Sequence, residues 1–186
     1  MKRKIFFALL IIAITSVTLF NSGCVSKALA ESVGKDIREN SNFEIGFLQE
    51  IESEFSFEDY YVSPGFGVTG YVPKKYGEDY AKNEQPAYVM YSVSSWRSLK
   101  NSPRVTSINC YDSAYNIYGL SIGDSYIKWE EVLSKKGFKL NEGSNPQEGI
   151  GVQRFYKNGV RINVNLEDGV VFAFSLYAEN TNLVIY

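Results

Sequence analysis

The sequence predicts an α+β fold in which a helix packs on an antiparallel β-meander, preceded by an N-terminal helix and a Tyr/Gly-rich loop region. Two observations favour this class. Residues 117–138 combine a short strand, a tight turn and an amphipathic helix with definite ends, and residues 150–176 then alternate between apolar and polar side chains. A helix followed by consecutive strands is typical of a two-layer α+β arrangement rather than of repeated βαβ units.

The best-defined element is the helix expected at residues 126–136. Asp124 or Ser125 can accept the free N–H groups of its first turn, and Gly137 can adopt the left-handed conformation that ends a helix. Charged side chains occupy one face of the helix. The other face is apolar and consists of Tyr126, Trp129, Val132 and Leu133. We therefore expect this helix to cover the sheet that follows it.

The strands after this helix are expected to form a meander. The Asn-Gly pair at residues 158–159 favours a type I′ turn between strands at residues 150–156 and 160–166. The second of these strands alternates, so one of its faces should be core and the other solvent. A third strand should continue the buried face with Val170, Phe172, Phe174 and Leu176. Residues 183–186 favour a short fourth strand.

The earlier part of the domain is expected to hold a helix, a loop region and two strands. Ser41 begins a capping-box pattern, and an apolar stripe at helical spacing predicts a helix at residues 42–55. This stripe consists of Phe43, Phe47, Leu48, Ile51 and Phe55. Residues 60–85 are rich in Tyr, Gly and Pro, which predicts mostly loop with one short hairpin. Residues 87–93 and 104–111 predict two further strands that can pair with each other.

The chain is expected to hold a single domain behind an export segment. Residues 1–30 have a basic start, a hydrophobic run and then small residues, which is typical of an export signal. Residues 31–40 carry too little patterned hydrophobicity to require packing and are expected to form a tether. The domain covers residues 41–186, with the N-terminal helix and loop region at 41–85 and the sheet and helix core at 86–186.

Two processing sites compete in the export segment. Residues 21–24 resemble a bacterial lipoprotein box, although Asn21 stands where an aliphatic residue is usual. In that case Cys24 would be lipidated and would anchor the protein to the cell membrane on its extracytoplasmic side. The alternative is cleavage after Ala30, where residues 28–30 follow the small-x-small pattern of an ordinary signal peptidase site, and the protein would be secreted. We favour the lipid anchor.

Composition excludes several classes of function. Of 186 residues, 45% are hydrophobic, enough to bury one core. Residues 1–30 hold four basic and no acidic residues, so the remaining chain has 15 basic and 21 acidic residues and a charge of −6, which argues against binding nucleic acid. The absence of histidine removes Ser-His-Asp catalysis and histidine metal sites. The acidic residues do not follow a calcium-loop spacing, so no metal and no other cofactor is expected.

A binding surface is the leading functional hypothesis. Tyrosine offers a flat apolar face with a polar tip, which suits both protein interfaces and stacking on sugars. The expected surface consists of Tyr60, Tyr61, Tyr71, Tyr76, Tyr80 and Trp96. The sequence therefore favours a non-catalytic module at the cell envelope that binds a protein partner. Three alternatives stay open: a module for cell-wall glycan, a hydrolase that uses carboxylates alone, and a spacer without a ligand.

The most distinctive stretch of the chain resembles a group of largely uncharacterised secreted proteins and lipoproteins of Gram-positive, clostridia-like bacteria. This stretch reads YNIYGLSIGDSYIKWEEVLSKKGFK, with NCYD upstream and RFYKNGVRINVNLEDG downstream. The residues that carry the match are turn and cap residues: Gly119, Gly123, Asp124, Ser125 and Gly137. More distantly, the layout is similar to lipoprotein domains of the SmpA/OmlA type and to β-lactamase-inhibitor-protein-like modules, which bind other proteins. The helix pair usual in those domains is not evident here, and the resemblance implies a fold rather than an activity.

Overall fold

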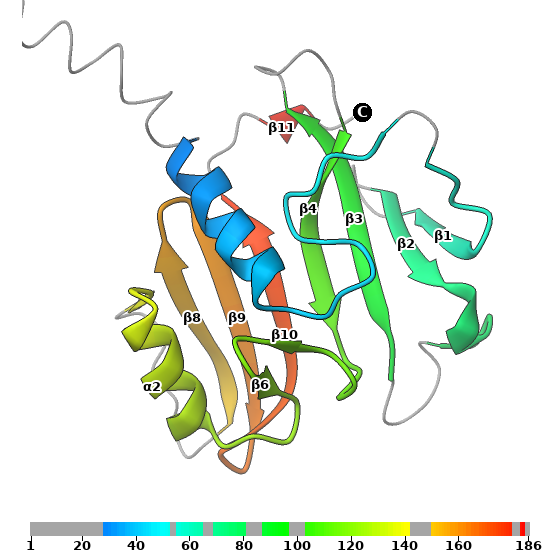
Figure 1. Cartoon of the computed structure of the whole chain (residues 1–186). Coiled ribbons are helices and arrows are strands. Elements are labelled where there is room, and N and C mark those ends of the chain that lie inside the picture. Colours follow the sequence, from blue (N-terminus) through cyan, green and yellow to red (C-terminus); the bar gives the residue numbers. More distant parts are fainter. Residues whose placement is uncertain are drawn as a thin grey trace, which may run out of the picture.

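A nine-stranded antiparallel sheet dominates the computed structural model, which describes residues 28–52, 55–64, 69–80, 87–96, 103–141, 150–179 and 183–184 (Figure 1). Its strands are β1 (Tyr60–Pro64), β2 (Thr69–Pro73), β3 (Val89–Trp96), β4 (Pro103–Cys110), β7 (Lys139–Leu140), β8 (Gly151–Lys157), β9 (Val160–Glu167), β10 (Val170–Ala178) and β11 (Leu183–Val184). Eight of them lie side by side in the order β1-β2-β3-β4-β10-β9-β8-β7, and β11 pairs with β3. The expected α+β class is therefore wrong, because the protein is mostly β.

Few helical residues accompany this sheet. The described part of the chain has a helix at residues 28–39, the helix α2 (Tyr126–Lys135) and the single 3₁₀ turn η1 (Lys74–Tyr76). A separate two-stranded sheet pairs β5 (Asn116–Ile117) with β6 (Leu120–Ser121). Among the described residues, no helix combines the length and the apolar character needed to cross a membrane.

The class was mispredicted partly because residues 60–85 contain more strand than expected. The tyrosine-rich segment there forms the antiparallel hairpin β1–β2, which adds to the sheet beside β3. β3 and β4 pair as expected, and β4 then pairs with β10, so the sheet is continuous from the hairpin to the C-terminal meander. A short hairpin was expected in this region, but its length was underestimated because turn residues stand at both ends of each strand.

The segment at residues 41–51 covers the sheet without forming a helix, so the helix expected at residues 42–55 is wrong. The Leu48 N–H donates to the Val105 carbonyl at 2.8 Å, and the Val105 N–H donates to the Gln49 carbonyl at 3.0 Å, so this segment pairs with the edge of β4. Leu48 has a φ of 58°, which a right-handed helix excludes. Phe47, Leu48 and Ile51 of the expected apolar stripe are nevertheless buried, whereas Phe55 is 36% exposed.

The helix at residues 28–39 is packed into the core, so the tether expected at residues 31–40 is wrong. Its buried residues follow helical spacing and are Ala30, Val33 and Ile37. Asp36 accepts a hydrogen bond from the Tyr118 hydroxyl at 2.9 Å and lies 3.6 Å from Lys136 Nζ, which joins this helix to the end of α2. The helix went unrecognised because its apolar stripe is short and crosses the expected end of the export signal.

The helix α2 confirms the sequence prediction in its position and its buried face. Ser125 caps the first turn, and Gly137 follows the last turn with a φ of 82°. Trp129 and Leu133 are fully buried. The Trp129 ring lies 5.1 Å from the ring of Phe174 in β10, so α2 packs directly on the sheet.

The meander β8–β9–β10 is confirmed with one correction. The turn at residues 158–159 has φ angles of 47° and 78°, as a type I′ turn requires. Val170 and Phe172 were expected on the buried face but are 42% and 47% exposed. A β-bulge between Val171 and Ala173 changes the register at this point, so Val171 takes the buried position instead.

The two faces of the sheet differ in character. The helix at residues 28–39, β6 and α2 all lie on one side, together with the segment that follows the first helix (Figure 1). Along β9 the side chains on this side are apolar and buried, whereas those on the other side are the half-buried Arg161, Asn163 and Asn165. We call this second side the open face, because no helix in the described part of the chain covers it.

Replacing Gln153 with Met should stabilise the protein. Gln153 is 1% exposed on the covered side of β8, and among the described residues neither its amide nitrogen nor its oxygen has a hydrogen-bond partner. An unpaired buried amide costs about 1–3 kcal/mol, and Met has a similar shape without that cost. We expect the free energy of unfolding, measured by urea denaturation, to rise by about 1–2 kcal/mol. The exposed neighbour Arg154→Met is the control, and a less stable Gln153→Met protein would contradict the prediction.

Candidate functional site

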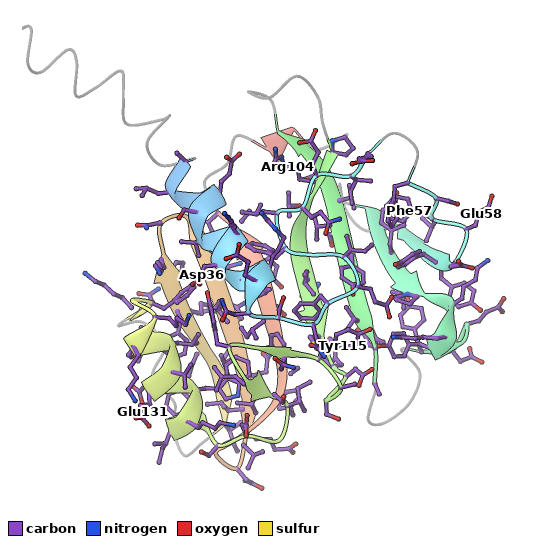
Figure 2. All side chains as sticks on the ribbon, in the orientation of Figure 1. Asp36, Phe57, Glu58, Arg104, Tyr115 and Glu131 are labelled. Atoms are coloured by element: carbon purple, nitrogen blue, oxygen red, sulfur yellow. The ribbon has the colours of Figure 1, made fainter. Side chains whose placement is uncertain are left out.

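A network of charged and phenolic side chains joins three separate parts of the chain on the covered side of the sheet. Glu44 lies in the segment at residues 41–51, Lys75 in η1, and Tyr115 in the turn before β5. Lys75 Nζ donates to Glu44 Oε1 at 2.6 Å and to the Tyr115 oxygen at 2.7 Å. The Tyr115 hydroxyl donates to the same Glu44 oxygen at 2.9 Å. Figure 2 shows Tyr115 below the segment that crosses the sheet.

The network fixes the charges of its members. Burial alone would raise the pKa of Glu44, but hydrogen bonds from Lys75 and Tyr115 lower this pKa below its usual 4.5. Burial alone would lower the pKa of Lys75, but the same hydrogen bonds raise it above its usual 10.5. Burial and a hydrogen bond to Asp112 raise the pKa of Tyr76. Near neutral pH these groups therefore supply fixed charges and hydrogen bonds, and they are poorly suited to proton transfer.

A group of aromatic rings lies beside this network, at the β1–β2 end of the sheet. Phe57 stacks on Tyr71 with ring centroids 3.7 Å apart, and it meets Phe55 and Tyr60 edge-on at 4.7 and 5.6 Å. Tyr60 also contacts Tyr91, which is fully buried, at 6.4 Å. Figure 2 shows Phe57 in front of this hairpin. These contacts hold the rings in fixed orientations.

Glu44 and Lys75 of the network and Phe55 and Tyr60 of the rings line a cavity of about 510 Å³. This volume falls within the range of small-molecule sites, about 300–1,000 Å³. The lining residues are Glu44, Phe55, Ser56, Asp59, Tyr60, Pro73, Lys74 and Lys75. The cavity, which we call the Tyr60 pocket, therefore combines an aromatic surface with two carboxylates and two ammonium groups.

A second cavity, of about 380 Å³, lies between the first helix and β4. It holds two guanidinium groups, but both are already used within the protein. Arg104 lies 3.0 Å from Glu50 and 3.8 Å from Glu31, and Arg38 donates to the Phe47 carbonyl at 2.7 Å. These contacts attach the helix and the segment after it to the sheet, so we assign this cavity a structural role.

Three tyrosines contact one another on the open face, two of them stacked and the third edge-on. Tyr88 and Tyr111 have ring centroids 4.8 Å apart, and Tyr80 meets Tyr88 at 5.0 Å. Their neighbours Val89 and Cys110 are paired across β3 and β4 and fully buried on the other side of the sheet, so alternation directs Tyr88 and Tyr111 to the open face. Burial and the neighbouring tyrosines raise the pKa of Tyr88 to about 12, which keeps its hydroxyl neutral.

This group continues across the open face onto β10 and β9. Asn109, two residues before Tyr111, accepts a hydrogen bond from the Tyr177 hydroxyl at 2.9 Å. The Arg161 guanidinium lies 4.6 Å from the centre of the Tyr177 ring and pairs with Glu179 at 2.6 Å. We call the whole set the tyrosine row, and it consists of Tyr80, Tyr88, Asn109, Tyr111, Arg161 and Tyr177.

The aromatic residues expected to form one binding surface are divided between places. Tyr60 lines the pocket, and Tyr71 packs behind it on Phe57. Tyr80 belongs to the tyrosine row on the other side of the sheet. Tyr76 donates its hydroxyl to Asp112 at 2.7 Å, beside the network. The structure therefore indicates two candidate surfaces in place of one.

The remaining predicted site residues contribute less to these surfaces. Tyr61 is half-buried in β1 and takes the opposite side from Tyr60. Trp96 is the last residue of β3, and its side chain lies outside the part of the chain that the structure describes. Cys24, the predicted lipidation site, also lies outside the described residues. The roles expected for Trp96 and Cys24 stay predictions.

Several residues of these surfaces were missed from the sequence. Tyr88 and Tyr111 stand at the ends of two predicted strands, and period-two alternation was a sufficient signal to place them opposite Val89 and Cys110. The network of Glu44, Lys75 and Tyr115 had no such signal, because its members are separated by 31 and 40 residues along the chain.

Comparison of the chain with protein-family models, with curated proteins and with solved structures finds no match. The resemblance to the group of secreted proteins and lipoproteins, and the more distant one to SmpA/OmlA-type domains, therefore stay predictions. Function has to be inferred from the side chains and surfaces of this chain itself.

Replacing Glu44 with Gln should reduce stability at neutral pH but not at low pH. The Glu44–Lys75 pair is nearly half-exposed, so we expect only about 0.5–1 kcal/mol at pH 7. Because folding lowers the pKa of Glu44, the ionised carboxylate stabilises the fold above about pH 4.5, and this is lost as the pH falls through the folded-state value. Urea denaturation of both proteins at pH 7 and pH 3 measures the difference. Equal differences at the two pH values would contradict this.

Proposed function

We propose that the protein is a non-catalytic module of the cell envelope that binds a protein partner through the tyrosine row. The row itself carries this proposal. Tyrosine and arginine are enriched among the residues that dominate binding energy at protein interfaces. Here Tyr88 and Tyr111 are ordered by stacking, and Tyr177 by a hydrogen bond and a cation–π contact, so little side-chain entropy remains to be lost on binding.

The absence of catalysis in this proposal is supported by the ionisable groups of the described residues. Glu44 and Lys75 neutralise each other, with pKa values displaced away from neutral pH. Burial raises the pKa of the Cys110 thiol to about 12, which leaves little of the reactive thiolate. Since the chain has no histidine, these groups offer no base with a pKa near 7.

We further propose that the protein is exported and anchored through a lipid on Cys24. The position of the first helix supports Cys24 over the competing site at Ala30. Ala30 is 2% exposed inside the helix at residues 28–39, so cleavage after Ala30 would cut a packed helix and remove part of its buried face. Processing at Cys24 would leave this helix whole.

Substitution in the tyrosine row should release the protein partner. The protein purified from cells that express the full chain is immobilised, and one envelope protein is expected to be retained from envelope extract in stoichiometric amount. Tyr88→Ala and Tyr111→Ala should each weaken its binding by at least about tenfold, because each removes a ring at the centre of the row. Pull-down followed by calorimetry with the identified protein measures this.

The control for this experiment is Ile127→Ala, which removes an apolar side chain that is 74% exposed on α2, on the covered side. This variant should retain the partner as wild type does. If no protein is retained, or if retention survives both tyrosine substitutions in folded proteins, the proposed function is wrong.

Cys24→Ser should move the protein from the membrane fraction to the soluble extracytoplasmic fraction. The substitution removes the thiol that would carry the acyl chains, and a chain without them lacks the two-signal anchoring that holds lipoproteins firmly. Cell fractionation with immunoblotting measures the distribution. Unchanged membrane retention of Cys24→Ser would exclude the lipid anchor.

A further inference from the structure

We propose that the Tyr60 pocket binds a neutral sugar ring, as found in an envelope glycan. This inference goes beyond the proposed binding of a protein, because the pocket lies on the covered side of the sheet and the tyrosine row on the open face. Its support comes from three features of the lining: ordered aromatic rings, adjacent donors and acceptors, and a balance of charge.

The aromatic wall of the pocket is formed by Phe55 and Tyr60. Phe55 is 36% exposed, so part of its ring is accessible to a ligand in the pocket. Both rings contact Phe57, which is itself stacked on Tyr71, so their planes are set before a ligand arrives. A sugar ring presents a face of C–H groups, and such a face packs well on an exposed aromatic ring.

The network offers a donor and an acceptor side by side. The hydrogen bonds from Lys75 and Tyr115 both end on Glu44 Oε1, so among the described residues Glu44 Oε2 has no bonded partner. Lys75 uses two of its three N–H groups in this network. A hydroxyl group both donates and accepts, and two neighbouring hydroxyls of a sugar can therefore bond to Glu44 and Lys75 together.

A second acceptor and donor, Asp59 and Lys74, also line the pocket. The Lys74 N–H donates to the Asp59 carbonyl at 2.8 Å, which places these residues together, and both side chains are exposed. No ion pair involves Asp59 or Lys74 among the described residues.

Charge balance then selects a neutral ligand. With two carboxylates and two ammonium groups, the pocket lining has no net charge. An anion or a cation would meet as many like as opposite charges in this lining and would gain no net attraction from it. A polyhydroxylated ring meets all four groups without a charge of its own. The volume of about 510 Å³ is sufficient for a ring of this size.

The test is calorimetric titration of the protein, purified from cells that express the full chain, with neutral tetrasaccharides of glucose, mannose and N-acetylglucosamine. We expect saturable one-site binding of at least one of them. Phe55→Ala and Lys74→Ala should each weaken it roughly tenfold or more, and Lys74→Ala, which alters an exposed side chain, should leave thermal unfolding unchanged. Lys135→Ala, which removes an equally exposed lysine from α2, should leave it unchanged.

Absence of saturable binding to all three tetrasaccharides would overturn the proposal, and so would binding that survives both pocket substitutions. Partner capture by the Phe55→Ala protein is measured in parallel. Capture that persists while sugar binding is lost assigns two independent sites, as expected. If sugar binding depends on Tyr111 instead of Phe55, the pocket assignment is wrong, whatever the result for the protein partner.

Discussion

The sheet has one apolar face, and the chain has to cover it with little helix. The described part of the chain provides only the helix at residues 28–39 and α2 for this purpose. Residues 41–51 fill the space between them, and an irregular segment can be buried only if its backbone groups find partners. The edge of β4 beyond its pairing with β10 supplies these partners for Leu48, Gln49 and Ile51.

The candidate pocket follows from the path of this segment. Once residues 48–51 are held by β4, the start of the segment passes over Tyr115, and Glu44 meets Lys75 from η1. The rest of the chain then has to return from the edge of β4 to β1 at the edge of the sheet. It does so with Phe55 and Phe57 facing the β1–β2 hairpin. The aromatic wall and the charged wall of the pocket therefore both result from the way this segment covers the apolar face of the sheet.

Local patterns in the sequence predicted the elements whose ends and faces are set by neighbouring residues. The cap at Ser125, the face of α2 and the turn at residues 158–159 all agree with the structure for this reason. The apolar stripe at residues 43–55 correctly indicated that most of this segment is buried, but it wrongly predicted a helix. Burial there comes from a covering segment paired with β4, and β4 is more than fifty residues away in sequence. The fold class failed mainly because the β1–β2 hairpin and the pairing of β4 with β10 join all the long strands into one large sheet, which the local patterns did not indicate.

The first helix changes how the protein would sit at the cell surface. With the expected tether, which ends at residue 40, sixteen residues would separate an anchor on Cys24 from the domain, and the domain would move well away from the membrane, since each extended residue spans roughly 3.5 Å. The structure instead has packed helix from residue 28 onward, so an anchor on Cys24 would leave three residues, or about 10 Å, between the lipid and the domain. Partners of the tyrosine row and the pocket would then have to approach within the layer next to the membrane. This favours ligands that are themselves held at the envelope over freely diffusing ones, because tethering both sides raises their effective concentration.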